Sequence, residues 1–417
     1  MTYTKPVRMA RGSTARLRPT ALARQAQPRF FRNQRPQAPR GAVIAKSGVS
    51  IGPCVDVAWL QRNLEDVRVY DVRGSVSEPD AWGAGGCSAD YDAYLEGHIP
   101  GAVFVSWVRD AASWQPGADS GSSSSSSAPS SSGSSSAGAP KPQRQVLAVL
   151  VDPDAYVPCF EARGLSAERP VVVYDNGTNM IAARVWWQLL LYGHPSPYVL
   201  HGGWDAWRSA GGGSELYEPC PLKLSSVYDA EPQLRYRASP EEFRLAATHG
   251  SADDGGTGEE PAVVAVLLMP ESYDAAPAAD APAAQVPSPS SICSSGHDDL
   301  PRARRLSLPA LLRACTGVTP TPTSTNTEPT STGSNGGIGG SLPPWTAVAA
   351  AASAHGSGGG GALAARLAAA LGAAVGPASR TRLLLASPHD AALSACAVGA
   401  LLHAAGHGRW AVCEEVL

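Results

Sequence analysis

The chain has 417 residues, which suits two domains, but its 43 glycines and 36 prolines shorten the length that can pack into a core. Its net charge of -3 and pI of about 6.3 give no indication of a polyanionic partner such as nucleic acid. The sequence contains no uninterrupted run of 18 apolar residues that would predict a membrane span. The eight cysteines are scattered without a CxxC pair, so neither a metal site nor a disulfide framework is expected.

Residues 1–48 form a basic segment with nine arginines, two lysines and no acid, and the first carboxylate is Asp56. This composition, without the apolar core of a secretory signal, is typical of an organellar transit peptide. Scarce serine favours the mitochondrion over the chloroplast, although the VIA before Lys46 also suits a plastid cleavage site. A disordered basic tail is the alternative.

The first domain is expected to span residues 49–210. Helical spacing at 55–64 is followed by alternating apolar residues at 67–72, which predict a strand. Asp71 and Arg73, at the end of that strand, are expected to form an ion pair that orients the turn.

The motif GHIPGA at residues 97–102 predicts a tight turn into a short strand, because its glycines allow close backbone turns and its proline fixes one φ angle. His98 in this motif is therefore expected to be a structural turn residue and not a catalyst. Residues 115–142 are nearly all Ser, Gly, Ala and Pro, and this composition predicts a disordered insertion.

The stretch from Arg169 to Trp207 organises the domain. Three valines and Tyr174 form an apolar run typical of a buried parallel strand. A polar loop at 175–180 follows, and apolar residues at helical spacing then run to Gly193. The next strand ends at Leu200, so the stretch is a βαβ unit of an α/β fold. A loop between strand and helix suits anion chemistry, because the first amides of a helix have no internal partner.

The segments YDNGTNMIAARVWWQLLLYGH and VLHGGWDAW, together with GHIPGA, resemble the N-terminal domain of the two-domain rhodanese family, the thiosulfate and 3-mercaptopyruvate sulfurtransferases. The resemblance implies tandem rhodanese-like domains, each a small parallel sheet flanked by helices. It also implies a reaction in which a cysteine in the strand-to-helix loop takes up sulfane sulfur as a persulfide and passes it to an acceptor.

The resemblance carries over to individual positions of the first domain. Asp175 stands at the position that matches the nucleophile, and two-domain members typically have aspartate there while the cysteine lies in the second domain. Arg184 matches a family arginine that points towards the anionic end of the substrate, and an ion pair or cap across the interface is the alternative role. A second family arginine is Leu190 in this chain, which weakens the anion site.

Residues 211–237 are expected to be a linker, and 238–417 a degenerate second domain with a low-complexity insertion at 316–344. The domain opens with a helix at 238–247 that Ser239 caps. A strand at 263–270 lacks the aspartate and arginine that end its counterpart, and Gly296–His297 begin a broken copy of the turn motif.

The last segment keeps the strand, loop and helix outline from Arg382 onward. Matching SAC at 394–396 to the family's TAC places His389 at the position of the nucleophilic cysteine, beside the negative charge of Asp390. Cys396 and Cys413 are expected to be buried small apolar residues. A hydrolase triad of Ser387, His389 and Asp390 is not expected, because three near neighbours on one short loop do not form the required relay.

The sequence therefore predicts a sulfurtransferase-family protein of weak or no activity, and the alternative is a catalytically inactive rhodanese-like binding or regulatory module that holds an anion near Arg184. An erroneous gene structure at the C-terminal end is a third explanation for the losses there. The resemblance implies a small sulfur-containing anion as donor and a thiol or cyanide as acceptor, without a cofactor, a metal, nucleic acid or a membrane. We expect a monomer.

Overall fold

The computed structural model describes nine stretches of the chain: residues 52–76, 87–116, 145–150, 153–216, 227–249, 262–270, 300–316, 345–354 and 357–414. The predicted transit peptide, most of both predicted insertions, and Gly296 with His297 lie outside these stretches. Within them, no helix is long and apolar enough to cross a membrane.

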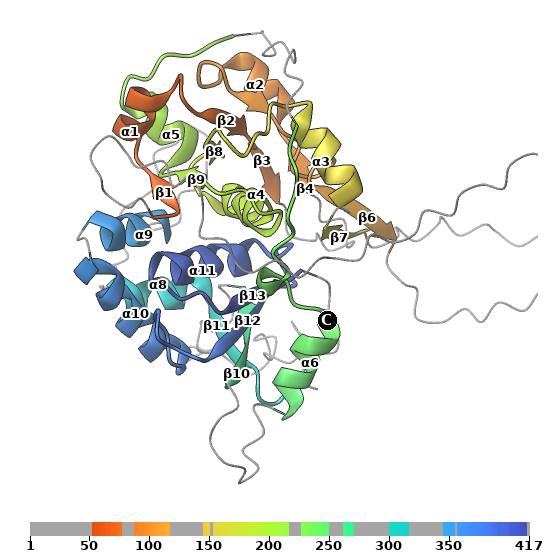
Figure 1. Cartoon of the computed structure of the whole chain (residues 1–417), viewed down its shortest axis with the longest axis vertical. Coiled ribbons are helices and arrows are strands. Elements are labelled where there is room, and N and C mark those ends of the chain that lie inside the picture. The colour runs from red at the N-terminus through yellow and green to blue at the C-terminus, as the bar shows by residue number, and fades with distance from the viewer. Residues whose placement is uncertain are drawn as a thin grey trace, which may run out of the picture. The chain divides into compact units, whose positions relative to one another are not determined.

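The first half contains a five-stranded sheet in which every neighbouring pair is parallel, in the order β1-β9-β8-β2-β5 (Figure 1). Its strands are β1 (Cys54–Val55), β2 (Arg68–Asp71), β5 (Val103–Phe104), β8 (Val171–Tyr174) and β9 (Pro197–Leu200). Its helices are α1 (Val57–Asn63), α2 (Tyr91–Glu96), α3 (Pro153–Glu161), α4 (Met180–Leu191) and α5 (Gly203–Ser209).

The second half contains a four-stranded sheet, also parallel throughout, in the order β11-β10-β12-β13. Its strands are β10 (Val263–Met269), β11 (Arg304–Ser307), β12 (Arg382–Ala386) and β13 (Trp410–Cys413). Its helices are α6 (Pro240–His249), α8 (Leu308–Thr316), α9 (Trp345–Ala354), α10 (Ser357–Leu371) and α11 (Leu393–Ala404). Two parallel sheets with helices form the α/β architecture that the sequence predicts.

Two antiparallel hairpins and one 3-10 turn complete the described elements. The hairpins are β3 (Gly74–Val76) with β4 (Cys87–Ala89), and β6 (Ala112–Pro116) with β7 (Gln145–Leu150). The turn η1 (Leu234–Tyr236) lies in the predicted linker. Gln115 and Pro116 therefore belong to strand β6, so the first predicted insertion begins two residues too early.

Several predicted boundaries shift for local reasons. The helix predicted at 55–64 begins at Val57, because Asp56 caps it by accepting a hydrogen bond from the Trp59 amide at 2.6 Å and Val55 pairs in β1. The cap predicted at Ser239 forms, with its hydroxyl accepting from the Glu242 amide at 3.1 Å. Helices α9 and α10 have no counterpart in the sequence prediction, since a run of alanine and glycine gives no apolar period.

The turn motif after α2 is tied to the end of β2 by buried polar groups. Arg73 forms an ion pair with Asp71 at 2.8 Å, as predicted, and the same guanidinium donates to the Gly97 carbonyl at 2.6 Å. His98 is fully buried and its Nδ1 lies 2.8 Å from the Tyr94 carbonyl oxygen. These contacts support the structural role expected for His98.

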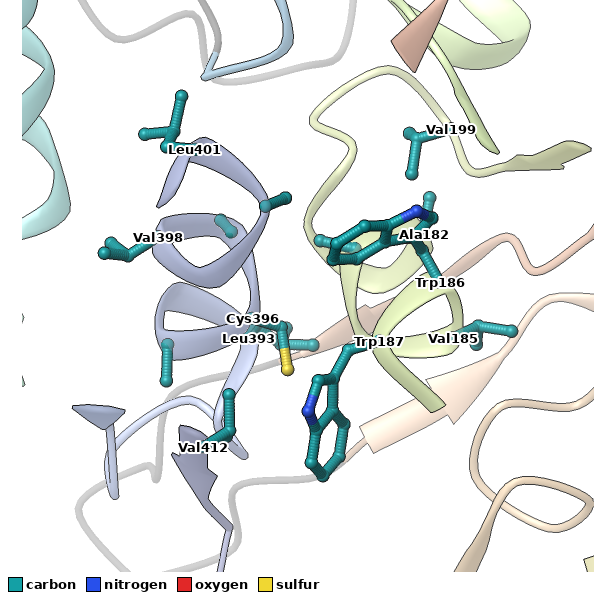
Figure 2. Close-up of a cluster of buried hydrophobic side chains, with 14 of the residues drawn as sticks. Ala182, Val185, Trp186, Trp187, Val199, Leu393, Cys396, Val398, Leu401 and Val412 are labelled. Atoms are coloured by element: carbon teal, nitrogen blue, oxygen red, sulfur yellow. The ribbon is translucent and has the colours of Figure 1, made fainter. Parts of the chain in front are cut away.

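The largest cluster of buried side chains contains residues of both sheets and of helices α4 and α11. The two helices pack against each other, and Figure 2 shows Trp187 of α4 beside Leu393 and Cys396 of α11. Trp187 has no exposed surface, and its indole donates to the Tyr236 carbonyl in η1 at 2.9 Å. Each of these two helices follows a strand-to-helix loop, one in each half, so the two loops lead into helices that pack against each other.

Candidate functional site

The candidate site consists of two strand-to-helix junctions, one in each half. We call residues 175–179, between β8 and α4, the first loop, and residues 387–392, between β12 and α11, the second loop. Each loop ends in a residue with left-handed backbone directly before its helix, Asn179 with φ 60° and Ala392 with φ 62°. The second loop is one residue longer, and it holds Ala391 in the same region with φ 57°.

In the first loop a single carboxylate satisfies the amides at the helix start. Asp175 is buried, and its Oδ1 accepts from the amides of Gly177 at 3.0 Å and Asn179 at 2.9 Å. Its Oδ2 accepts from Ile181 at 3.1 Å and Ala182 at 3.2 Å, in the first turn of α4. Burial raises the pKa of Asp175, and the four amide donors act in the opposite direction. The loop therefore saturates its own anion-binding amides.

In the second loop two side chains share the same task. The Ser387 hydroxyl donates to Asp390 Oδ1 at 2.5 Å and accepts from the Ala395 amide at 3.2 Å. Asp390 Oδ2 accepts from the Ser394 amide at 2.9 Å and from the Ser394 hydroxyl. Ser394 and Ala395 are the second and third residues after the left-handed position, as Ile181 and Ala182 are in the first half. The two halves thus present equivalent amide pairs.

Ser387 takes the place in the second loop that Asp175 takes in the first. Each residue directly follows the last residue of its strand, and each accepts from the third amide after the left-handed position. Sequence matching instead put His389 at this position, two residues later. The extra loop residue accounts for one of these two positions. The other arises because Ser394 takes the place of Ile181 in the structure, whereas the match of SAC to TAC sets it against Met180. The signal available in the sequence was the distance from the strand end.

His389 lies at the edge of this arrangement. Its side chain is partly exposed, and its Nε2 is 3.6 Å from Asp390 Oδ2. Asp390 therefore lies between Ser387 and His389, whereas a hydrolase relay needs the histidine between serine and acid. The loop does not form that triad.

Arg184 connects the two halves. It lies on α4, has 1% of its surface exposed, and donates from Nη1 to the Ala391 carbonyl in the second loop. The sequence left two roles open for this side chain, holding the anionic end of a substrate or capping across the interface; this contact is of the second kind, and the anion-holding role stays a prediction. The contact partner is a backbone oxygen of the loop.

No described cysteine lies in either loop. Cys396 is in α11, fully buried, and Figure 2 shows its sulfur near Trp187 in the interface of α4 and α11. Burial raises the pKa of the Cys396 thiol, and it raises the pKa of Cys87 in β4 to about 11. The charge of Arg184 lowers both pKa values and that of Asp390 raises both, to a smaller extent than burial. Thiols with raised pKa are poor nucleophiles near neutral pH.

The other described cysteines also lie outside the two loops, and burial disfavours the thiolate of three of them. Burial raises the pKa of Cys54, of Cys159 and of Cys315, the last to about 11. Cys413 is a buried residue of β13. Cys220 and Cys293 lie outside the described residues. The described stretches also contain no group of three or more His, Cys, Asp or Glu side chains arranged to hold a metal ion.

Comparison with known proteins gives a family match for part of the chain. Residues 56–210 match the rhodanese-like domain family. A putative thiosulfate sulfurtransferase of Mycobacterium tuberculosis is 32% identical over 166 residues, which cover 40% of this chain and 46% of that protein. A probable 3-mercaptopyruvate sulfurtransferase of Pseudomonas aeruginosa is 33% identical over 147 residues, which cover 35% and 40% of the two chains. The matched part thus spans less than half of these curated relatives.

Among solved structures, the 3-mercaptopyruvate sulfurtransferase of Escherichia coli is 14% identical, with a TM-score of 0.49 over 88% of this chain and 99% of that one.

Proposed function

Since residues 56–210 form a rhodanese-like domain, we propose that this chain is a sulfurtransferase-family protein without the persulfide carrier of the family reaction in its second loop. The observation that carries the proposal is the junction after β12. There Ser387 and Asp390 bond to each other and accept hydrogen bonds from the amides at the start of α11. A serine hydroxyl does not carry sulfane sulfur, because the reaction requires a thiolate that forms a sulfur–sulfur bond.

The substrate class of the proposal follows from the names of the relatives. A thiosulfate-like or 3-mercaptopyruvate-like anion is the donor, and a thiol or cyanide is the acceptor. A transit peptide within residues 1–48 agrees with an organellar location, and one relative from Arabidopsis thaliana is named as mitochondrial. Imaging of the full chain with a C-terminal fluorescent tag tests this location, and we expect a mitochondrial signal.

The experiment for the activity is intact-mass spectrometry of the purified, folded chain after incubation with thiosulfate or 3-mercaptopyruvate, and again after cyanide. We expect no gain of one sulfur, about 32 mass units, that cyanide removes. A catalytically active rhodanese treated in parallel is the positive control. A cyanide-sensitive adduct on any cysteine, located by peptide mapping, contradicts the proposal.

The second candidate is a catalytically inactive rhodanese-like binding or regulatory module. The buried guanidinium of Arg184 at the second loop favours it, because a fixed positive charge next to a loop is a recognition element for anions. Calorimetric titration with thiosulfate tests this candidate, since a module is expected to bind the anion although no persulfide forms. Loss of that binding in Arg184→Met, with the same melting temperature, assigns the binding to this residue.

A further inference from the structure

We propose that Asp390 determines the specificity of the second loop by closing it to anionic sulfur. Its carboxylate acts as a built-in anion on the Ser394 amide in the first turn of α11, which would otherwise face an incoming anion. The inference rests on the proposed function, because it takes sulfur anions as the ligands that the loop excludes.

The two loops differ in where the negative charge at the helix start comes from. In the first half Asp175 saturates its amides without help, and no anion is expected to displace a buried carboxylate held by four amide donors. The second loop has only a serine at the equivalent position, and a hydroxyl brings no charge to the helix start. The negative charge that the amides attract comes instead from Asp390, three residues later.

Both carboxylate oxygens of Asp390 accept hydrogen bonds. Oδ1 accepts from the Ser387 hydroxyl at 2.5 Å, and Oδ2 accepts from the amide and the hydroxyl of Ser394. Hydrogen bonds to a charged carboxylate are shorter and stronger than those between neutral groups. The carboxylate is thereby fixed over the Ser394 amide instead of pointing into solvent.

The backbone of the second loop also holds Asp390 in place. Ala391 and Ala392 are both left-handed, and alanine adopts this conformation only at a cost. The turn is held by the Ala392 amide, which donates to the Ser387 carbonyl at 3.0 Å, and by the Leu393 amide, which donates to the Asp390 carbonyl at 3.1 Å. The loop thus holds Asp390 beside Ser387 through its backbone as well as through side chains.

The charge of Asp390 is expected to act on any thiol placed at position 387. A carboxylate in hydrogen-bond contact with position 387 raises the pKa of any acid placed there, because two negative charges repel each other. Four other titratable or charged groups interact with Asp390 or its loop: His389 at 3.6 Å, Arg184 through the Ala391 carbonyl, and the thiols of Cys87 and Cys396. The hydrogen bonds of the Ser387 hydroxyl go instead to Asp390 and the Ala395 amide. The charge of Asp390 is therefore expected to dominate at this position.

The experiment introduces a thiol as the probe. Ser387→Cys is prepared in the native background and together with Asp390→Asn, which removes the charge and keeps the shape. The rate of iodoacetamide alkylation of the peptide that contains position 387 is followed against pH. We expect the pKa of the introduced thiol to be at least about one unit lower in the double variant. Glu241→Gln, which removes an exposed acid from the first turn of α6, is the matched control and leaves this pKa unchanged.

Equal thiol pKa values in the two backgrounds overturn the inference. Incubation with thiosulfate supplies a second readout, in which the introduced thiolate attacks the sulfane sulfur, the sulfur–sulfur bond of thiosulfate breaks and sulfite leaves. We expect the resulting cyanide-sensitive persulfide only in the double variant, and an equal yield in Ser387→Cys alone also overturns the inference. Failure of the proposed function is distinct, because it appears as an adduct in the native chain, which has no thiol at position 387.

A measurement on the native chain keeps the inference testable even where Asp390→Asn does not fold. In an amide-resolved nuclear magnetic resonance titration with thiosulfate, we expect no saturable shift of the Ser394 and Ala395 amides. A saturable shift of these two amides shows that an external anion reaches them in the presence of Asp390, and it overturns the inference.

Discussion

The first loop and the second loop solve one structural problem with different side chains. Both must satisfy the free amides of a helix that starts directly after a buried parallel strand. Asp175 does so with one carboxylate, whereas Ser387 and Asp390 divide the task between a hydroxyl and a carboxylate. The fold requires acceptors at this junction and does not require a thiol. The architecture of the second half is therefore compatible with a second loop that contains no cysteine.

The largest effect is expected where the two halves share their packing. Trp187→Ala removes a fully buried indole from the interface of α4 and α11 and breaks its hydrogen bond to η1. We expect a loss of about 3–5 kcal/mol in the free energy of unfolding, measured by urea denaturation. Trp204→Ala, at a partly exposed position of α5, is the control and costs less. Independent unfolding of the halves, with only the first one shifted, contradicts a shared core.

The next prediction compares the two acids directly. Asp175→Ala leaves four amide donors without their acceptor at a buried site, and we expect a loss of about 3 kcal/mol in the free energy of unfolding. Asp390→Ala frees one amide and two hydroxyls, and the hydroxyls rotate to new partners, so the expected loss is about 1 kcal/mol. Urea denaturation of both variants gives the difference. Equal losses contradict the view that the first loop depends more on its carboxylate.

A third prediction concerns the histidine that follows α4. His194 is buried against the Ser166 carbonyl, and burial lowers its pKa from 6.5 to about 4. Between these values the unfolded chain binds a proton that the folded chain does not, so stability falls as the pH is lowered from about 6.5 to about 4. The contribution is roughly 3 kcal/mol over this window. His194→Gln is expected to flatten this part of the stability curve, measured by urea denaturation at several pH values, and an unchanged slope contradicts the assignment.

The smallest expected effect is at the contact between α9 and the first loop. The buried hydroxyl of Thr346 donates to Asn179 Oδ1 at 3.2 Å and lies 2.7 Å from His201 Nδ1. Thr346→Val keeps the volume and removes these bonds, so we expect a loss of about 1 kcal/mol in the free energy of unfolding. Hydrogen exchange of the first loop should also become faster. Thr346→Ser keeps the hydroxyl and is expected to leave that exchange rate near the native one.

Much of the first half was predictable because its signals are local. The apolar run at β8 and the helical spacing of α4 gave element boundaries within about a residue, and Gly193 marked the helix end as expected. In the second half the same reasoning found β10, β12 and α11. It did not find α9 and α10. Alanine favours a helix and glycine disfavours one, but neither residue type shows which face of a helix is buried.

The sequence by itself determined the α/β class, the strand, loop and helix pattern in both halves, and the absence of cysteine from the stretch between β12 and α11. Only the tertiary structure decided that Ser387, and not His389, corresponds to Asp175, and that Ser387 and Asp390 divide the helix amides between them. The physical reason is that the extra loop residue is absorbed by two left-handed alanines. Alanine propensity does not predict that conformation, and only the strand and helix that hold the loop impose it.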